Sequence, residues 1–198
     1  MKYVTINEPL LKFWVLGTVP TEDIKTTSTI KIIKILIDAT LKDKLSGQHN
    51  RLHVHECEQM LLDIHQQMLM LNKHHLSVSH FDIDDIVIID KKYYFINDKK
   101  ILNVKNSHIT IKKLYDESMF LPYEMGNDTE TISLPLNIHI NAYIYSLALL
   151  TLYCMFNTPF KTRDESLKIL NQIPGIGIYW CMCRCLEINA KERILLYI

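Results

Sequence analysis

The sequence predicts a mainly helical α+β domain with one β-hairpin inserted after its second helix. Three segments, at about 30–41, 53–74 and 141–157, repeat apolar residues at the ~3.6-residue spacing of a helix. Between the second and the third, two apolar runs, Ile86–Ile89 and Tyr93–Ile96, flank a short polar turn, as the strands of a β-hairpin do. Helical spacing in three segments, with two strand-like runs between the second and the third, therefore predicts the α+β fold class.

The N-terminal part is expected to hold a short leading segment and then the first helix. Residues 1–27 form that segment, and residues 28–198 form the main domain. Thr27 or Ser28 is expected to cap the first helix, and Ser46-Gly47 is expected to end it. The second helix follows directly and leads into the hairpin.

The C-terminal half is expected to be built around one buried helix. The segment 141–157 is apolar on nearly every side, so it should run through the core. Pro159 follows its end, and two further helices are expected at 163–172 and at about 179–186. Residues 99–135 are mostly polar and are expected to be irregular.

Composition limits the possible partners. Of 198 residues, 48% are hydrophobic and 22% are charged, as in a globular protein, and the 22 basic and 22 acidic residues cancel. No overall field therefore favours nucleic acid or an acidic membrane. The apolar run Ile144–Phe156 is too short to span a bilayer. The odd number of cysteines, five, favours reduced thiols in an intracellular setting.

Three other features have simpler structural explanations than a site. Alternate residues of a helix point about 200° apart, so Cys181, Cys183 and Cys185 do not converge on a metal and are expected to be small packed side chains. The basic stretch 99–113 is expected to be a solvated loop rather than a nucleic-acid contact. Tyr179-Trp180 fits an exposed surface for a partner and core packing equally well.

Several motifs occur in one order along the second half of the chain. Leu121–Glu124 is similar to an Ala-Pro-Glu motif, and Tyr143–Ala148 is similar to Asp-Val-Tyr-Ser-Leu-Gly. Pro159-Phe160 follows, and Cys185-Leu186 precedes Arg193. Together these motifs resemble the C-terminal lobe, or C-lobe, of protein kinases. Small kinase-like proteins of large DNA viruses are similar in this respect.

The resemblance covers about residues 30–198 and implies a C-lobe-like fold without the usual roof over ATP. About 27 residues before the first helix are too few for a five-stranded upper lobe, or N-lobe, which is expected to be absent or vestigial. The five glycines form no G-x-G-x-x-G loop to cover phosphates. Lys31 or Lys34 could serve as the phosphate-binding lysine only if the first helix were a strand.

The resemblance leaves two alignments of the catalytic loop open. Without gaps, His80 takes the position of the catalytic base, Asp85 that of the metal-binding Asn, and Asp98 that of the Asp in Asp-Phe-Gly. The second alignment lays His80-Phe81-Asp82 on His-Arg-Asp, which makes Asp82 the base but needs a two-residue deletion. These carboxylates suit Mg²⁺, but they also suit turns and caps beside a hairpin.

The structural motifs are better kept than the catalytic ones. The resemblance implies an ion pair between Glu124 and Arg193, and an arginine suits a two-pronged contact with a carboxylate that a lysine cannot make. By contrast, Tyr143 stands where kinases have the helix Asp that holds the catalytic loop. A phenol cannot accept two backbone N–H bonds as a carboxylate can.

The resemblance therefore implies a catalytically inactive kinase-like domain, a pseudokinase, that binds a protein or serves as a scaffold. No metal or cofactor is expected in it. One alternative is a divergent active viral serine/threonine kinase that uses Mg-ATP, with Asp82 as base and Asp98 on the metal. The other is a structural component of a virion or assembly. The expected location is the host cytoplasm, or the virion, if the protein is viral.

Overall fold

The computed structural model describes residues 2–6, 26–27, 30–31, 33–47, 50–113, 118–126 and 132–196. Its α-helices are α2 (Leu41–Leu45), α3 (Val54–Lys73), α4 (Tyr123–Gly126), α5 (Ala142–Phe156), α6 (Arg163–Leu170) and α7 (Gly177–Cys185). The short 3-10 helices within these ranges are η2 (Ile83–Asp85), η3 (Asp98–Lys100) and η4 (Ala190–Glu192). With the strands below, they make an α+β fold.

The strands pair in antiparallel sheets. They are β1 (Lys2–Ile6), β2 (Thr26–Thr27), β3 (Ile30–Lys31), β4 (Ile33–Ile37), β5 (Ala39–Thr40), β6 (Leu76–Ser77), β7 (Ile86–Ile89), β8 (Lys92–Phe95), β9 (Leu102–Lys105), β10 (His108–Ile111) and β11 (Leu136–His139). In the described residues β1 pairs with β4 and β2 with β3, while the larger sheets have the orders β5-β7-β8 and β11-β10-β9-β6.

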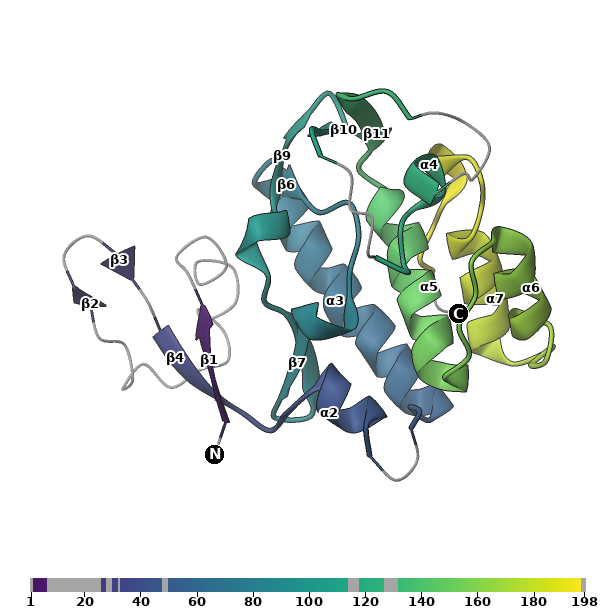
Figure 1. Cartoon of the computed structure of the whole chain (residues 1–198), viewed down its shortest axis with the longest axis horizontal. Helices are drawn as coiled ribbons and strands as arrows, with labels where there is room; N and C mark the ends of the chain where they lie inside the picture. The colour runs from purple at the N-terminus through teal and green to yellow at the C-terminus, as the bar shows by residue number, and fades with distance from the viewer. Residues whose placement is uncertain are drawn as a thin grey trace.

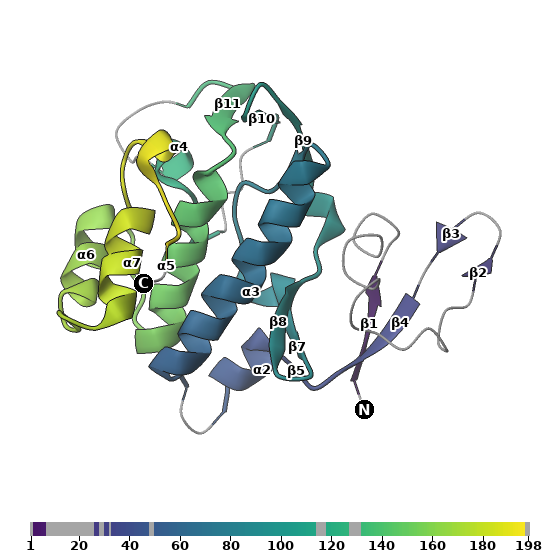
Figure 2. The same cartoon turned by 180° about the vertical axis from the view of Figure 1, so that it is seen from behind.

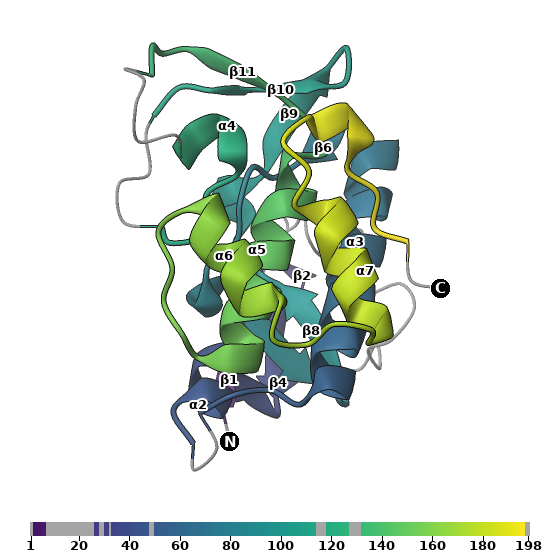
Figure 3. The ribbon, with the colours of Figure 1, turned by 90° about the vertical axis from the view of Figure 1, so that its right-hand side faces the viewer.

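Two helices form the centre of the molecule. Figure 1 shows α3 and α5 side by side, with α6 and α7 beyond α5 and the strands β1–β4 on the opposite side, beyond β7. The view from behind shows β7 and β8 against α3 (Figure 2). The sheet that contains β10 and β11 lies across one end of the helices (Figure 3).

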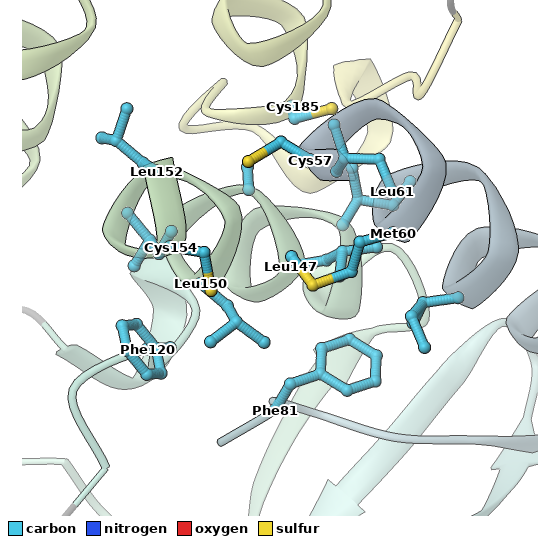
Figure 4. Close-up of a cluster of buried hydrophobic side chains, with 14 of the residues drawn as sticks. Cys57, Met60, Leu61, Phe81, Phe120, Leu147, Leu150, Leu152, Cys154 and Cys185 are labelled. Atoms are coloured by element: carbon cyan, nitrogen blue, oxygen red, sulfur yellow. The ribbon is translucent and has the colours of Figure 1, made fainter. Parts of the chain in front are cut away.

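The main core lies between α3, α5 and the loop before the first hairpin. Thirteen residues of α5 are buried, which fits its apolar sequence, and α3 buries only one face. In Figure 4, Met60 and Leu61 of α3 face Leu147 of α5, with Phe81 closing one side. Each such side chain, when fully buried, contributes about 1.5–3 kcal/mol. Among the described residues, no helix has both the length and the apolar character needed to cross a bilayer.

The predicted helices at 53–74, 141–157, 163–172 and 179–186 are confirmed, and each of their ends lies within two residues of the observed one. The predicted hairpin is confirmed as β7 and β8, which pair from Ile86↔Phe95 to Ile89↔Lys92. Long periodic segments and a compact turn are therefore readable from the sequence.

The first predicted helix, expected to run from Thr27 or Ser28 to Ser46-Gly47, is wrong over most of its length, because the structure has strands at 30–31, 33–37 and 39–40. Only its last turn is helical: α2 begins after Thr40, whose side chain accepts from the Asp43 backbone N–H in a capping box, and ends at Ser46 as predicted. Isoleucines at alternate positions of β4 favour a strand, because β-branched side chains pack well on a pleated surface. β1, from the predicted segment 1–27, pairs with β4 of the main domain.

The prediction that residues 99–135 are irregular is also wrong for β9 and β10. The turn between these strands uses Asn106 and Ser107, both with positive φ, which is the geometry of a tight hairpin. The strands are only four residues long, so each gives a weak pattern. The signal that could have found them is the alternation of Ile109 and Ile111, both buried, with exposed polar neighbours.

Side chains of α3 complete the outer edge of β8. Asp63 accepts the Tyr93 N–H at 2.9 Å, while Gln67 accepts the Phe95 N–H at 3.0 Å and donates to the Tyr93 carbonyl at 2.7 Å. Gln67 is buried, and an edge strand needs such partners for its backbone groups. The helix and the hairpin are thereby held in one register.

We predict that Gln67→Ala lowers the free energy of unfolding by about 2 kcal/mol or more, because each buried backbone group left without a partner costs about 1–3 kcal/mol. The neighbouring Gln66 is exposed, so Gln66→Ala is the matched control and should change stability by less than about 0.5 kcal/mol. Urea titration measures both. Equal effects of the two substitutions would contradict this role of Gln67.

Candidate functional site

The loop that follows α3 and carries His80 and Asp82 is anchored by the buried side chain of Phe81. Phe81 is fully buried and packs edge-on against Phe95, with ring centroids 5.5 Å apart, and against Tyr143 at 6.5 Å. His80 is also buried, at 1% exposure, and its Nδ1 lies 2.8 Å from the Ser79 hydroxyl. Burial lowers the pKa of His80 to about 4, with Lys100 adding to the effect, so its imidazole is neutral near neutral pH.

A serine of α5 holds this loop in place. The Phe81 backbone N–H donates to Ser146 Oγ at 2.8 Å, inside the core. Ser146 lies three residues after Tyr143, so the two side chains leave α5 on neighbouring positions of one face. Tyr143 itself contacts His65 of α3, with its hydroxyl 2.9 Å from Nδ1. Ser146 was not predicted as part of a site; its signal was a polar residue, like Thr151, within a mostly apolar helix.

Two aspartates and one lysine meet beside this loop in what we call the Asp82–Lys100 cluster: Asp82, Asp85, Asn97, Lys100 and Ser118. Lys100 Nζ bonds to one oxygen of Asp82 and lies 2.6 Å from Asp85 Oδ2. The other oxygen of Asp82 accepts from the Ser118 hydroxyl at 2.6 Å, and that of Asp85 accepts from Asn97 Nδ2 at 2.7 Å. Every carboxylate oxygen in the cluster therefore already has a donor.

The cluster is closed to solvent on the side of Asp85. The side chains of Asp85 and Lys100 are 4% and 11% exposed, whereas that of Asp82 is 35% exposed. Burial raises the pKa of Asp82, but hydrogen bonds from Lys100 and Ser118 outweigh it, and the net shift is downward. Asp82 is therefore ionised at neutral pH and forms a charge-assisted contact with Lys100.

The structure brings some of the predicted site residues together and leaves Asp98 at the start of a neighbouring turn. Asp82 and Asp85 are brought together, and His80 Nε2 lies 3.8 Å from Asp82. Asp98 opens η3, the single turn that carries Lys100 into the cluster. Lys100, the cation of the site, was missed, because two adjacent lysines in a polar stretch look like a solvated turn.

The predicted ion pair of Glu124 with Arg193 is present and bidentate. Arg193 Nη1 and Nη2 lie 2.9 Å and 3.0 Å from the two oxygens of Glu124. The guanidinium is fully buried, and it also donates to the carbonyls of Glu187 at 2.7 Å and Ile188 at 2.9 Å. Its carbon lies 4.9 Å from the ring centroid of Tyr145, which adds a cation–π contact.

The remaining sequence candidates are packed cysteines and an exposed tryptophan. Cys181 and Cys185 are buried and Cys183 is half-buried, as expected for packed cysteines. Trp180 is 61% exposed, with Tyr179 packed edge-on against it. Within the described ranges, no three His, Cys, Asp or Glu side chains are grouped as metal ligands would be.

We predict that Arg193→Ala lowers the free energy of unfolding by about 3–5 kcal/mol, because it leaves a carboxylate and two carbonyls without their donor. Arg193→Lys should recover less than half of this loss, since an ammonium cannot form the fork. Arg184 is exposed on α7, so Arg184→Lys serves as the control. Thermal melts in which Arg193→Lys matches wild type would contradict the bidentate role.

We predict that Ser146→Ala destabilises the chain by about 1–3 kcal/mol, because the buried Phe81 N–H loses its acceptor. Ser133 is exposed, and Ser133→Ala should be neutral within about 0.5 kcal/mol. Hydrogen exchange gives a local test, since the Phe81 amide should lose protection in the first variant only. Full protection of that amide in Ser146→Ala would show that the bond is dispensable.

Comparisons with known proteins identify no family for this chain. The sequence matches no protein-family model, and no curated protein shows significant similarity to it. Function is therefore inferred from the Asp82–Lys100 cluster and from the buried ion pair.

Proposed function

We propose that this chain is a protein kinase C-lobe-like domain that has lost catalysis and acts by binding a protein, as a scaffold or interaction module. The observation that carries the proposal is the Asp82–Lys100 cluster. In it, an internal lysine lies between Asp82, which takes the base position in the second alignment, and Asp85, which takes the metal-binding position in the gap-free one. Because Lys100 already pairs with both carboxylates, the site has no open coordination position for Mg²⁺.

The order of elements supports the kinase-like part of the proposal. The long helix α3 leads into a loop, the β7–β8 hairpin and then Asp98, as the resemblance requires. The Leu121–Glu124 motif and the buried helix α5 come next, and Glu124 pairs with an arginine 69 residues later. That long-range pair was expected from the motifs alone.

The geometry favours the second alignment of the loop, in which His80-Phe81-Asp82 replaces His-Arg-Asp. His80 is buried and its pKa is lowered to about 4, so it is a poor general base at neutral pH. Asp82 is the more accessible carboxylate of the cluster. Ser146 takes over part of the anchoring that the helix Asp provides in kinases, by accepting one N–H of the loop.

Charge and coordination explain why the cluster resists a metal. Mg²⁺ requires near-octahedral oxygen ligands, and here the carboxylate oxygens already accept from Lys100, Ser118 and Asn97. Removing the lysine from the buried Asp85 costs about 3–5 kcal/mol. A nucleotide-bound cation would have to offset that cost before it contributed any affinity.

One observation favours the alternative of a divergent active serine/threonine kinase. Lys31 ends β3 and Lys34 lies on β4, so both stand on strands, the type of element that carries the phosphate-binding lysine in kinases. Under this alternative Asp82 is the base, and Asp98 holds the metal of Mg-ATP. The cluster then has to open when nucleotide binds.

We predict that Mg-ATP leaves the melting temperature of the wild-type chain unchanged. A ligand at about a hundred times its dissociation constant would add about 2.7 kcal/mol of stability, which a thermal-shift measurement detects readily. Such a shift, or phosphate transfer to a generic serine/threonine substrate, would establish the active-kinase alternative instead.

We predict that Lys100→Met destabilises the metal-free chain and makes it responsive to Mn²⁺, because the two carboxylates lose their cation and a divalent ion can replace it. The adjacent Lys99 is exposed, so Lys99→Met is the matched control and should show neither effect. Thermal melts with and without Mn²⁺ give both readouts. Identical behaviour of the two variants would remove the support that Lys100 gives to the proposal.

A further inference from the structure

Two histidines face each other across the exposed side of the β10–β11 pair. His108 and His139 are direct partners in the strand register, and their rings are 5.6 Å apart and nearly perpendicular. The opposite face of the same strands packs Ile109 and Ile138 against Met125 of α4. The pair therefore lies above a small core that joins this sheet to the helices.

Hydrogen bonds assign different tautomers to the two rings. His108 Nδ1 lies 2.7 Å from the Asn106 carbonyl, which can only accept, so this nitrogen carries a proton. His139 Nδ1 accepts the Asn141 backbone N–H at 3.2 Å, so this nitrogen carries none. His108 can therefore take up a second proton and keep its contact, whereas His139 loses its contact when it is protonated at Nδ1.

The surroundings of His139 oppose a positive charge. Burial lowers its pKa below the ordinary value of 6.5, and His108 of β10, Lys191 of η4 and Arg193 add to this, while Glu124 of α4 acts in the opposite direction. The N-terminus of α5, two to three residues away, carries the positive end of the helix dipole. Neutral His139 thus fits this place, and its imidazolium does not.

We propose that His139 is an acid-sensitive latch between β11 and α5. In the neutral form it accepts the Asn141 N–H and fixes the first turn after the strand. Protonation breaks this bond, puts two N–H groups against each other and places a cation beside His108. Asn141 also donates through its side chain to the Arg193 carbonyl at 3.4 Å, so release reaches the segment that holds the buried ion pair.

The direction of the pH effect follows from the lowered pKa. The unfolded or released state binds a proton near the ordinary histidine pKa, and the latched state binds it only at lower pH. The stabilisation is therefore fully present above about pH 6.5 and is lost as the pH falls through the pKa of the latched form. Acidification loosens β11, and neutralisation restores it.

Replacement by asparagine separates titration from structure. An Asn side-chain oxygen can accept the N–H two residues later, as His139 Nδ1 does, but it does not titrate. Between about pH 7.5 and about pH 5.5, protection of the Asn141 amide against hydrogen exchange, corrected for the intrinsic rate, should fall in wild type, because the released state gains a proton over this range and the latched state resists it. His139→Asn should keep constant protection. Constant protection in wild type, or an equal fall in His139→Asn, overturns the proposal.

A measurement on the wild-type chain makes the test independent of any variant. Long-range proton–nitrogen NMR spectra report which ring nitrogen is protonated and at which pH the ring titrates. The proposal requires that His139 carry its proton on Nε2 at neutral pH and titrate below the ordinary histidine value of 6.5. A proton on Nδ1 at neutral pH, or titration of His139 at or above that ordinary value, overturns it.

Discussion

The buried guanidinium of Arg193 is the constraint on which the packing of the C-terminal half depends. A buried arginine must have its N–H groups satisfied, because an unpaired charge in the core costs several kcal/mol. Here the satisfying groups come from α4, from the two residues after Leu186 and from the face of Tyr145 on α5. One side chain therefore fixes three segments relative to one another, which explains why an arginine, with its planar fork, is used rather than a lysine.

The requirement that a buried charge be paired also governs the Asp82–Lys100 cluster, where the buried charge is the carboxylate of Asp85. Asp85 is nearly as buried as Arg193, and its charge is balanced by Lys100 from the short turn η3. The loop that bears Asp82 is held from below by Phe81 and Ser146, so both carboxylates are presented to that lysine in fixed positions. In the proposed function, a pre-arranged acidic site of this kind is satisfied by the chain itself, and the molecule keeps the shape of the lobe without its chemistry.

The fold was predictable where an apolar pattern extended over many residues or where sequence motifs occurred in a defined order. The helices α3 and α5 follow from periodicity over many residues, and the pairing of Glu124 with Arg193 followed from motifs with a defined order. The strand β4 was missed because its isoleucines also fit the spacing of a helix. The strands β9 and β10 are as short as β7 and β8, but their apolar residues alternate with polar ones and do not form a continuous apolar run. Lys100 and Ser146 were missed because their roles arise only when distant segments meet, which the sequence does not show.

The most direct test of the central claim is a crystal structure of the wild-type chain grown with excess Mn²⁺ and ADP, with data collected for the anomalous signal of manganese. We expect Lys100 Nζ to lie between Asp82 and Asp85, with no manganese peak beside them. A manganese ion bound to these two carboxylates, with Lys100 turned away, would contradict it and would show that the site opens to a metal–nucleotide complex.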